Sequence, residues 1–426
     1  MAGVRPLTRA AIIAVGSELL TASKLDTNSL FITDRLNELG IDVVSKAIVG
    51  DDRDELVHVV TALLTRVDLL VLCGGLGPTD DDVTRDAVAI ALRRPLAEDE
   101  QMTARLRARF AARGFTMPMP ENNRRQAMVP AGARVIENTR GSAPGLWIEH
   151  DDRVVLLLPG PPRELKPMVT ALTEGSLRER TSGAPIVRRV VRIAGRIESQ
   201  VDEVLGPLYK EWSARIPPVA ATILAQPGSI ELHLSTRHAS SDEVTASLDR
   251  AVSDAVSVIG PDAYSTDGRL LEEIVGTLLV ERGLRIGVAE SCTGGLISSR
   301  LTDVPGSSRY VDASIVTYSN QSKIDLLDVA SSLIDVHGAV SEPVALAMAD
   351  GIRARAPADV GVGVTGVAGP SGGTPEKPVG TVVIAVVTAS ARRVRTFRFF
   401  GERAQVKFQA GQSALDMARR LLLDVP

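Results

Sequence analysis

Cysteine and histidine are scarce in this chain of 426 residues. Its two cysteines, Cys73 and Cys292, can build neither a disulfide framework nor a structural zinc site, and they suit a reducing compartment. Five scattered histidines without an HExxH spacing argue against a histidine-rich metal centre. The apolar stretch near the start is too short for a signal peptide, and no apolar run approaches about 18 residues. We therefore expect a cytoplasmic protein with no membrane association.

Lysine is scarce too, because it supplies only seven of the 48 basic residues and arginine supplies the other 41. Arginine keeps its proton at accessible pH whereas a buried lysine can lose it, so each lysine is a candidate for proton transfer. The formal net charge of -4 argues against a protein whose main role is to coat nucleic acid. With 44% hydrophobic but only 3% aromatic residues, we expect large aliphatic cores.

Strand and helix patterns alternate along the chain, whose length predicts roughly two to four domains. In the first block, short apolar runs alternate with helical periodicity, which predicts an open, doubly wound α/β sheet. Its strands are expected at 10–15, 42–49, 68–73 and 153–158. A short middle block has a β-α-β-β-α pattern, and the last block alternates again. Linker-like composition at 173–185 and 260–269 gives three predicted domains, at 1–172, 173–260 and 261–426.

A glycine-rich loop follows the strand expected at 68–73 and precedes a helix. Gly74, Gly75 and Gly77 would let backbone N–H groups approach an anion, and a helix N-terminus favours phosphate. Ligands bind at the carboxyl ends of strands in such sheets, so other loops at strand ends are expected to share this cleft. These loops are 16–20, 122–126 and 158–164.

Three consecutive acids, Asp80, Asp81 and Asp82, follow this loop. They would repel a bare phosphate, so the pattern favours a divalent metal such as Mg²⁺, Mn²⁺ or Co²⁺ that bridges carboxylate and phosphate. The alternative is helix capping by Thr79 or Asp80, with the remaining acids in solvent near the helix dipole. The residues by themselves leave both interpretations open.

A candidate nucleophile follows a buried strand in the last block. The motif Ala289-Glu290-Ser291-Cys292-Thr293-Gly294-Gly295 is expected to open a helix, with Ser291 exposed at its N-terminus. The N–H groups from Cys292 to Gly295 could then stabilise an oxyanion. We favour Ser291 over Cys292, because a thiolate would need a histidine or a positive neighbour, and a buried cysteine is usually a small apolar residue.

A serine nucleophile needs a base, and the segment from Val316 to Lys323 supplies Tyr318 and Lys323 at the end of a predicted strand. A desolvated lysine has a lowered pKa and can act as general base. The spacing fits neither YxxxK nor SxxK, so a dyad of Ser291 with Lys323 would have to be assembled in space. The alternative for Lys323 taken alone is a solvated surface lysine.

A third loop follows another buried strand. Gly361, Gly363 and Gly366 spell GxGxxG, but the first two fall within the strand and no acid ends a second strand about 20 residues on. We therefore reject a dinucleotide fingerprint and expect a ligand-contacting loop that includes Gly366 and Gly369. Arg403 could hold a phosphate, or it could be an ordinary surface arginine.

The segments GSELL, DTN, GGLGPTDDDVTRD, NNRRQA, SAPG and LPGPPRELKPM resemble, in order, the N-terminal domain of the CinA (competence/damage-inducible) family, which is related to the molybdopterin-binding fold. The resemblance implies a metal-dependent ADP-ribose pyrophosphatase, with Asp80, Asp81 and Asp82 as metal and catalytic candidates. The implied ligand-binding residues are Glu18, Asn28, Gly74, Gly75, Gly77, Thr79, Asn123 and Gly160. Molybdopterin binding remains an alternative for this domain.

The segments AESCTGG, VTYSNQSK, HGAVSE, GVTGVAGP, PVGTV and GER resemble the C-terminal domain of the same family, an α/β nicotinamide mononucleotide (NMN) amidohydrolase. The resemblance implies hydrolysis of NMN to nicotinate mononucleotide and ammonia, in pyridine nucleotide recycling and without a cofactor. Ser291 would be the nucleophile and Lys323 its base, with Tyr318 and Thr365 assisting. Oxyanion or substrate contacts would come from Thr293, Gly294, Gly295, Gly366, Gly369 and Arg403.

The middle block would be the small KH-type α+β domain of this family. A KH domain that binds nucleic acid needs a GxxG loop, and Gly195-Arg196-Ile197-Glu198 lacks the second glycine. We therefore expect a spacer or dimerisation element, and the resemblance implies a homodimer. The rival hypothesis for the whole chain is a non-catalytic interaction protein of competence or DNA repair.

Overall fold

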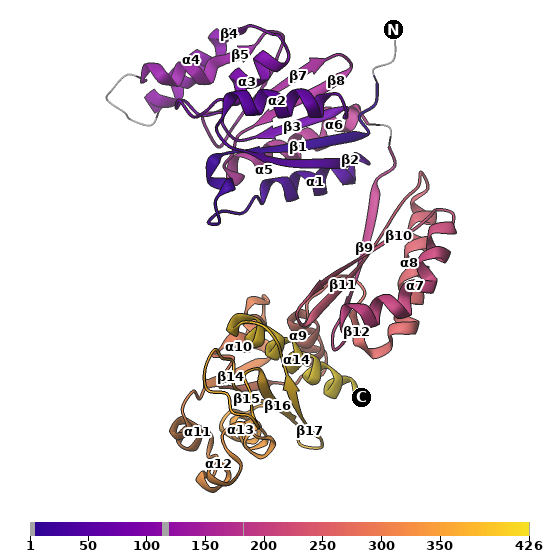
Figure 1. Ribbon diagram of the computed structural model, residues 1–426, viewed down its shortest axis with the longest axis vertical. Helices are drawn as coiled ribbons and strands as arrows, with labels where there is room; N and C mark the ends of the chain where they lie inside the picture. The colour runs from indigo at the N-terminus through magenta and orange to yellow at the C-terminus, as the bar shows by residue number, and fades with distance from the viewer. Residues whose placement is uncertain (1–4, 113–118, 182, 426) are drawn as a thin grey trace. The chain divides into compact units, whose positions relative to one another are not determined.

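The apolar run near the start forms β1 (Arg9–Val15), an interior strand of a six-stranded sheet in the computed structural model, which describes residues 5–112, 119–181 and 183–425. The sheet order is β2-β1-β3-β8-β7-β6. The first four strands run parallel (Figure 1), β7 pairs antiparallel with β8, and β6 pairs antiparallel with β7. The other strands are β2 (Asp42–Val49), β3 (Leu69–Cys73), β6 (Arg134–Ile136), β7 (Gly145–His150) and β8 (Arg153–Leu158).

Helices cover both faces of this sheet, as the doubly wound prediction requires. Successive residues of β1 point to opposite faces, so Ile13 packs in the core under α2 and α3, and Ile12 packs in the core under α1 and α5. These helices are α1 (Asn28–Glu38), α2 (Arg53–Leu64), α3 (Thr84–Ala91) and α5 (Pro162–Glu174). The shorter or peripheral elements are η1 (Ser17–Leu20), β4 (Leu96–Glu98), α4 (Glu100–Ala112), η2 (Glu121–Ala127), β5 (Met128–Pro130) and α6 (Ser176–Glu179). The linker expected at 173–185 therefore begins in helix.

The last block forms a five-stranded sheet in the order β14-β13-β15-β16-β17, in which β14, β13 and β15 run parallel. One face packs on α9, α10 and α14, and the other on α11, α12 and α13. The strands are β13 (Ile286–Glu290), β14 (Val311–Val316), β15 (Val360–Gly366), β16 (Thr381–Val387) and β17 (Arg392–Arg398). The helices are α9 (Leu271–Glu281), α10 (Leu296–Asp303), η4 (Ser307–Arg309), α11 (Asn320–Leu327), α12 (Ser331–His337), α13 (Glu342–Arg355) and α14 (Arg403–Leu423).

The glycines of the rejected GxGxxG pattern serve helix packing. A Cβ on Gly361 would lie 2.1 Å from the carbonyl oxygen of Ala349, and one on Gly363 would lie 2.3 Å from that of Ala345. Both carbonyls belong to α13, so the two glycines let this helix lie directly on β15. This role agrees with the prediction that the pattern is no dinucleotide fingerprint.

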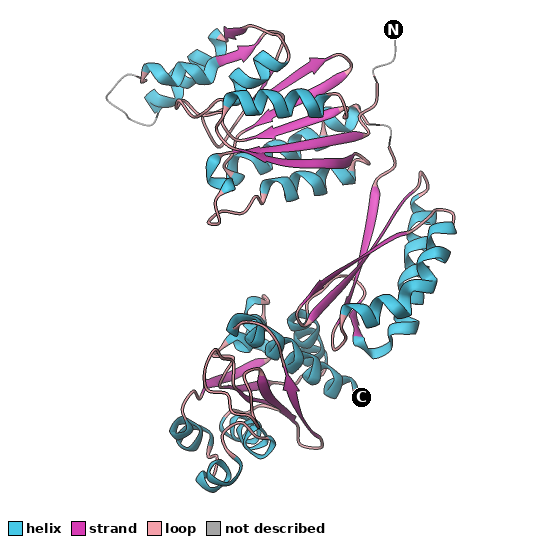
Figure 2. Ribbon diagram, in the orientation of Figure 1, coloured by secondary structure: helices cyan, strands magenta, loops and turns pink. Residues whose placement is uncertain are grey.

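The middle block folds as predicted into β9 (Ile186–Ile193), α7 (Glu198–Ala214), β10 (Ala220–Gln226), β11 (Ser229–Arg237) and α8 (Ser241–Ile259) (Figure 2). The linker expected at 260–269 is wrong in part, because it contains η3 (Gly260–Asp262) and β12 (Ala263–Ser265). β12 pairs antiparallel with β9 and completes a sheet in the order β10-β11-β9-β12. Tyr264 of β12 then packs into the core of the last block.

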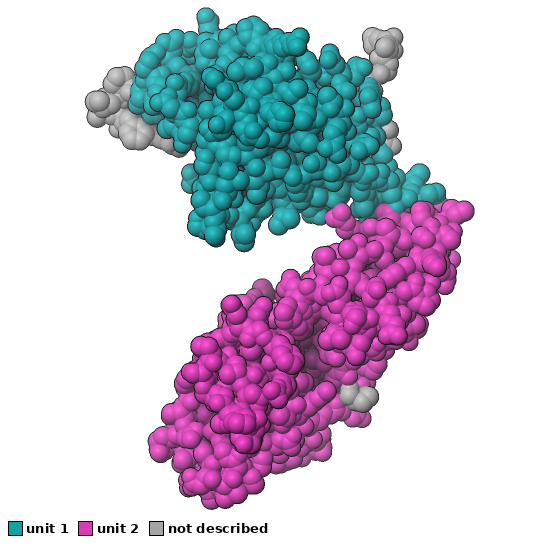
Figure 3. All heavy atoms as spheres, viewed as in Figure 1, with its two compact units in different colours: residues 1–187, 237–241 teal, residues 188–236, 242–426 magenta. Residues whose placement is uncertain are grey.

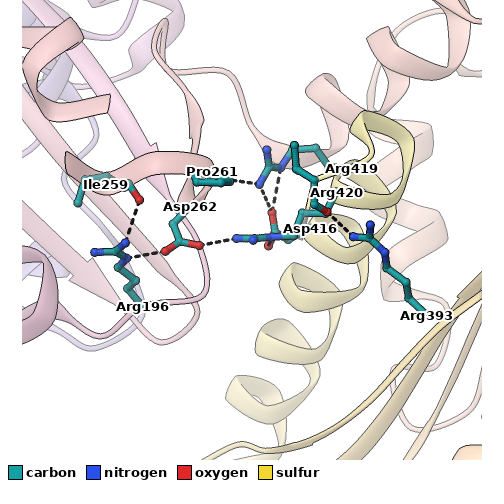
Figure 4. A network of polar contacts seen from close by, with 9 residues as sticks. Arg196, Ile259, Pro261, Asp262, Arg393, Asp416, Arg419 and Arg420 are labelled. Atoms are coloured by element: carbon teal, nitrogen blue, oxygen red, sulfur yellow. Dashed lines mark hydrogen bonds and ion pairs between the residues drawn. The ribbon is translucent and has the colours of Figure 1, made fainter. Parts of the chain in front are cut away.

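The chain divides into two compact units, one of residues 1–187 with 237–241 and one of residues 188–236 with 242–426 (Figure 3). In the second unit, Asp262 accepts hydrogen bonds from Arg196 and from Arg420 of α14 (Figure 4). Asp416 of α14 in turn binds Arg420 and Arg419. This ionic network and the shared core explain why the middle and last blocks form one unit. Across the described residues, no helix is both long and apolar enough to cross a membrane.

Candidate functional site

Ser291 and Lys323 meet at the carboxyl end of the C-terminal sheet. Ser291 directly follows β13, and Lys323 lies in the first turn of α11, after the neighbouring parallel strand β14. The Nζ atom of Lys323 lies 3.1 Å from Oγ of Ser291. Lys323 is only 1% exposed, so its interpretation as a solvated surface lysine is wrong. The structure brings together two residues that lie 32 positions apart in the sequence.

The amine of Lys323 is surrounded by neutral oxygens. Besides Ser291, its Nζ donates to the carbonyl oxygens of Thr317 at 2.9 Å and Ser319 at 3.4 Å. No carboxylate forms an ion pair with it within the part of the chain that the structure describes. Burial disfavours the charged form and holds the pKa of Lys323 below its ordinary value. The site therefore favours the neutral amine more than water does for an ordinary lysine, and the neutral amine is the form that can accept a proton from Ser291.

The start of α11 places this lysine. Ser319 is the N-cap, and its Oγ accepts a hydrogen bond from the backbone N–H of Ser322 at 3.0 Å. This cap ends the extended segment after β14 and begins the helix, so the Lys323 side chain lies in the first turn. The positive end of the helix dipole also disfavours a cation there, in the same sense as burial.

Glu290 organises the turn that carries the candidate nucleophile Ser291. Its carboxylate is fully buried and accepts hydrogen bonds from the N–H groups of Gly295, Ile297 and Ser298, at 2.9, 3.2 and 2.9 Å. It also accepts the Ser298 hydroxyl at 2.6 Å. Glu290 thus occupies the N-terminus of α10, which begins at Leu296. The helix expected directly after Ser291 therefore starts five residues later, and Ser291 is buried, at 7% exposed, rather than exposed.

Two of the four predicted oxyanion amides are already engaged. The N–H of Gly294 donates to the carbonyl of Ser291 at 3.1 Å, and that of Gly295 donates to Glu290. Among the described residues, the N–H groups of Cys292 and Thr293 have no oxygen acceptor. These two amides directly follow the candidate nucleophile Ser291, at the position where an oxyanion hole would need its donors.

Cys292 is a packing residue in this turn. It is 5% exposed and belongs to the core between the sheet and α14. Burial raises the pKa of its thiol to about 12, so the thiol stays protonated at neutral pH. This geometry favours Ser291 over Cys292 as the nucleophile.

Arg403 forms a hydrogen bond with Tyr318, which lies in the loop between β14 and α11. Nη2 of Arg403 donates to the Tyr318 hydroxyl at 2.5 Å, and Nη1 donates to the carbonyl of Gly369 at 2.6 Å. Tyr318 is 62% exposed, so the ring is open to solvent. Arg403 is the first residue of α14 and joins the loop after β14 to the loop after β15. It is therefore bound to two of the predicted site residues.

Three buried threonine hydroxyls lie close to Ser291 or Lys323, either in the sequence or on a strand that neighbours β13. Thr365, near the end of β15, donates its hydroxyl to the carbonyl of Ala339 at 2.8 Å and so holds the neighbouring loop. The hydroxyls of Thr293 and Thr317 are buried and have no hydrogen-bond partner among the described residues. An unpartnered buried hydroxyl is costly, so these two are sites where a water or substrate group would bind.

A separate cavity of about 650 Å³ lies in the first unit. It opens where β1, β3 and β8 end, at the point where successive crossovers leave the sheet in opposite directions. Its lining includes the predicted residues Glu18, Asn28, Gly74, Gly75, Gly77, Asp81, Asp82 and Gly160. The four segments that the sequence assigned to one cleft thus all contribute to this cavity.

Glycine is required in this loop. Gly74 has φ of +108°, and a Cβ there would lie 2.1 Å from the carbonyl oxygen of Val15. Gly75 has φ of +64°, in the left-handed region. Because Gly74 lies so close to β1, backbone atoms rather than a side chain line this part of the cavity.

Asn28 and Gln126 present unpartnered acceptors at the cavity. Nδ2 of Asn28 donates to the carbonyl of Gly160 at 2.7 Å, whereas its Oδ1 is buried without a donor. Oε1 of Gln126 is also buried without a donor among the described residues. Gln126 lines the cavity and the predicted Asn123 does not. Both acceptors suit a ligand with hydroxyl or amine donors.

Comparison with known proteins places this chain in a family. Residues 269–422 match the CinA C-terminal domain, and residues 11–179 match a probable molybdopterin binding domain. A CinA-like protein of Koribacter versatilis is 46% identical over 97% of this chain and 100% of its own length. The chain belongs to the CinA family. A putative competence-damage inducible protein of Symbiobacterium thermophilum is 45% identical over 97% of the chain and 99% of its own length.

Solved CinA-family structures match one part of this family member. The competence/damage inducible protein CihA of Agrobacterium tumefaciens is 40% identical, covers 34% of this chain and 90% of its own, and superposes with a TM-score of 0.34. The CinA protein of Thermoplasma acidophilum is 32% identical, covers 39% of this chain and 98% of its own, and has a TM-score of 0.37.

The three consecutive acids of this CinA-family chain have different surroundings. Asp82 accepts hydrogen bonds from the N–H groups of Gly77 and Thr79 and from the Thr79 hydroxyl, at 2.7, 2.8 and 2.6 Å. Asp80 is 94% exposed in its side chain and pairs with Arg125. Asp81 lines the cavity. The capping alternative is wrong in its residues, because the N-cap of α3 is Val83.

A metal would therefore meet a partial set of ligands in this CinA-family protein. Within the described residues, no three His, Cys, Asp or Glu side chains gather as a metal site. Asp81 and Glu18 both line the cavity. A hydrogen bond from Lys24 holds the pKa of Glu18 below its usual range. Two ionised carboxylates with phosphate oxygens fit Mg²⁺, Mn²⁺ or Co²⁺.

Sequence reasoning did not single out three residues of these candidate sites. Glu290 carries no local capping signal, because it lies five residues before the N-cap Gly295 and reaches the start of α10 only through the folded turn. Gln126 lies three positions from the predicted Asn123 in the same loop. Thr317 carries no local signal, because only the assembled structure shows that its hydroxyl is unpartnered.

Proposed function

We propose that the C-terminal region hydrolyses a primary carboxamide through an acyl-enzyme on Ser291. The observation that carries this proposal is the buried contact of 3.1 Å between Nζ of Lys323 and Oγ of Ser291. A lysine with a lowered pKa and no carboxylate partner in the described chain supplies a neutral base. Family resemblance supplies the substrate, which is NMN, in pyridine nucleotide recycling.

Acylation begins when Nζ of Lys323 takes the proton of the Ser291 hydroxyl and Oγ attacks the carboxamide carbon. Negative charge then develops on the amide oxygen, and the N–H groups of Cys292 and Thr293 are the donors that directly follow the nucleophile. Protonated Lys323 returns its proton to the leaving nitrogen. The C–N bond breaks, ammonia leaves, and a nicotinoyl ester of Ser291 remains.

Deacylation uses the same groups in reverse. Water gives a proton to Lys323 and attacks the ester carbon, and the Ser291 oxygen leaves and recovers the proton. Nicotinate mononucleotide is the product. The unpartnered hydroxyls of Thr293 and Thr317 are the buried groups available to hold that water.

Ammonia release from NMN by the full chain tests this proposal. Wild-type protein should release ammonia stoichiometrically with nicotinate mononucleotide. Ser291→Ala should release none, and Lys323→Arg should lose at least about a hundredfold in kcat/KM, because arginine keeps the charge but cannot act as a base. Cys292→Ala is the matched control and should keep most activity. A folded wild type without ammonia release, or an active Ser291→Ala, would overturn the proposal.

For the first unit we propose a metal-dependent ADP-ribose pyrophosphatase. The cavity at the strand ends supports it, because unpartnered acceptors on Asn28 and Gln126 suit ribose hydroxyls or a base amine. Asp81 and Glu18 would hold the divalent metal, which when bound would offset the diphosphate charge and activate water. The Gly74–Gly77 loop would bring its backbone close to the ligand.

Turnover of ADP-ribose to AMP and ribose 5-phosphate, with and without Mg²⁺, Mn²⁺ or Co²⁺, tests the second activity. Asp81→Asn should lose turnover by at least about a hundredfold. Asp80→Asn is the matched control, because Asp80 faces solvent and pairs with Arg125, and it should lose less than about threefold. Equal activity of wild type and Asp81→Asn would contradict the assignment of Asp81 as a metal ligand.

A further inference from the structure

A second cavity, of about 330 Å³, lies beside α4 in the first unit. Met102 and Leu106 give it an apolar side, and Arg105, Arg109 and Glu137 give it charge. Neither the sequence motifs nor the proposed functions use these residues. Ser142 lines both this cavity and the larger one, so the two adjoin.

Two arginines without a carboxylate partner face this cavity. Arg105 and Arg109 are four positions apart on α4 and so lie on the same face of the helix. Neither forms an ion pair within the described part of the chain. Nη1 of Arg109 reaches only the carbonyl of Asn138, at 3.5 Å, and its Nε is buried without an acceptor. A buried donor left unpaired is costly, so this group requires an acceptor.

The two cavities differ in charge. Six carboxylates and one lysine line the larger cavity, whereas two arginines and Glu137 line the smaller one. A phosphate group is repelled in the larger cavity unless a metal is present, and it is attracted in the smaller one without a metal. The smaller cavity is therefore the place for an anionic group that no metal holds.

The wall between the cavities is fixed in place. Oδ1 of Asn138 accepts the N–H groups of Arg140 and Gly141, and its Nδ2 donates to Glu164 at 2.8 Å. A Cβ on Gly141 would lie 1.6 Å from Oε2 of Glu164, so this loop packs without spare room. Ser142 follows directly and opens to both sides.

We propose that the cavity beside α4 is an anion subsite for the phosphate of a nucleoside monophosphate such as AMP, whose base and ribose lie in the larger cavity, whereas the diphosphate of intact ADP-ribose lies at the metal in the larger cavity. This inference rests on the proposed nucleotide chemistry of the first unit. Arg105 and Arg109 donate to the phosphate, Met102 and Leu106 contact the attached apolar surface, and Glu137 weakens binding by repulsion. The subsite determines specificity for phosphorylated ligands.

Calorimetric titration of the full chain with AMP and with adenosine, in the absence of divalent metal, tests the subsite. AMP should bind at least about tenfold more tightly than adenosine, and raised salt should weaken only AMP. Arg105→Gln and Arg109→Gln should each lower AMP affinity by about tenfold. Glu137→Gln should raise it severalfold, a gain that loss of folding cannot mimic. Arg107→Gln on the same helix, which does not line the cavity, is the control.

The outcomes separate this inference from the pyrophosphatase. If AMP binding responds as stated but ADP-ribose is not hydrolysed, the subsite stands and the proposed activity fails. If Asp81→Asn abolishes hydrolysis but keeps AMP affinity, both stand. Equal binding of AMP and adenosine, no detectable AMP binding, unchanged affinity in both arginine variants, or weaker binding in Glu137→Gln would overturn the subsite.

Discussion

The carboxylate of Glu290 accepts both the backbone N–H and the hydroxyl of Ser298, at 2.9 and 2.6 Å. Glu290 directly precedes the proposed nucleophile Ser291, and Ser298 lies in the first turn of α10. One buried acid therefore fixes the turn that carries Ser291 and caps the helix that follows it. The position of the Ser291 side chain depends on this link between strand and helix.

We predict that Glu290→Ala lowers the free energy of unfolding by about 2–4 kcal/mol, because it leaves buried N–H groups without an acceptor. In the variant kcat for NMN should fall more than KM rises, since the turn loses its shape. Urea unfolding and ammonia-release kinetics measure the two effects. Ser314→Ala, which removes only an exposed hydroxyl contact of Ser298, should change stability by less than about 0.5 kcal/mol. Equal stability of the two variants would contradict the role of Glu290.

The pH dependence of NMN hydrolysis should report Lys323. Burial lowers its pKa, so the neutral base forms at a lower pH than for an ordinary lysine at about 10.4. We expect kcat/KM to rise with pH along an acidic limb and to level off below that value. A pH–rate profile with NMN measures this limb. A rise that continues unbroken through pH 10.4 would show that burial does not tune the base.

Stability should change with pH through the same residue. A buried lysine with a lowered pKa binds fewer protons in the folded than in the unfolded chain, so its contribution to stability increases as pH rises. Wild type should therefore gain stability relative to Lys323→Met between pH 7 and pH 9.5, the upper limit lying below the ordinary lysine pKa of about 10.4. Urea unfolding at both pH values measures the gap. A gap that does not change with pH would contradict a lowered pKa.

The fold was predictable because its signals are local. The alternation of β1, with Ile12 and Ile13 facing opposite cores, is written in consecutive residues. The strand ends and their glycine loops also indicated where the two candidate sites lie. The linker predicted at 260–269 failed because β12 has three residues, and its pairing with β9 is a contact between distant segments.

The candidate sites were predictable only as far as single motifs carry them. The motifs named Ser291 and Lys323, but their contact across 32 positions needed the parallel order of β14, β13 and β15. The helix N-terminus expected to bind the oxyanion is instead filled by Glu290. Sequence patterns indicate which groups lie near a strand end, whereas hydrogen-bond partners depend on how the turn closes.

We predict that Arg403 binds the phosphate of NMN. Its guanidinium is held by Tyr318 and Gly369, at the open side of the site. We predict that Arg403→Gln raises KM for NMN by about tenfold or more, through loss of a charge-assisted contact, with a smaller change in kcat. Steady-state kinetics with NMN and with nicotinamide riboside, which lacks the phosphate, measure the effect. If both substrates lose equally, Arg403 supports the loops and does not bind phosphate.

The link between Asp262 and α14 should control the stability of the second unit. Burial opposes ionisation of Asp262, but hydrogen bonds from Arg196 and Arg420 outweigh it and hold its pKa below the ordinary value (Figure 4). Asp262→Asn should cost about 1–3 kcal/mol at pH 7, because it weakens two charge-assisted contacts.

The pH dependence of this cost distinguishes the charge from the shape of Asp262. A carboxyl with a depressed pKa stabilises the fold above the unfolded pKa of about 3.9 and loses that contribution as pH falls through the folded value. The gap between wild type and Asp262→Asn should therefore be full at pH 7 and shrink below about pH 4. Urea unfolding from pH 7 to pH 3, with exposed Asp242→Asn as the control, measures it. If the difference in unfolding free energy is the same at pH 3, the lost stability comes from packing and not from the charge of Asp262.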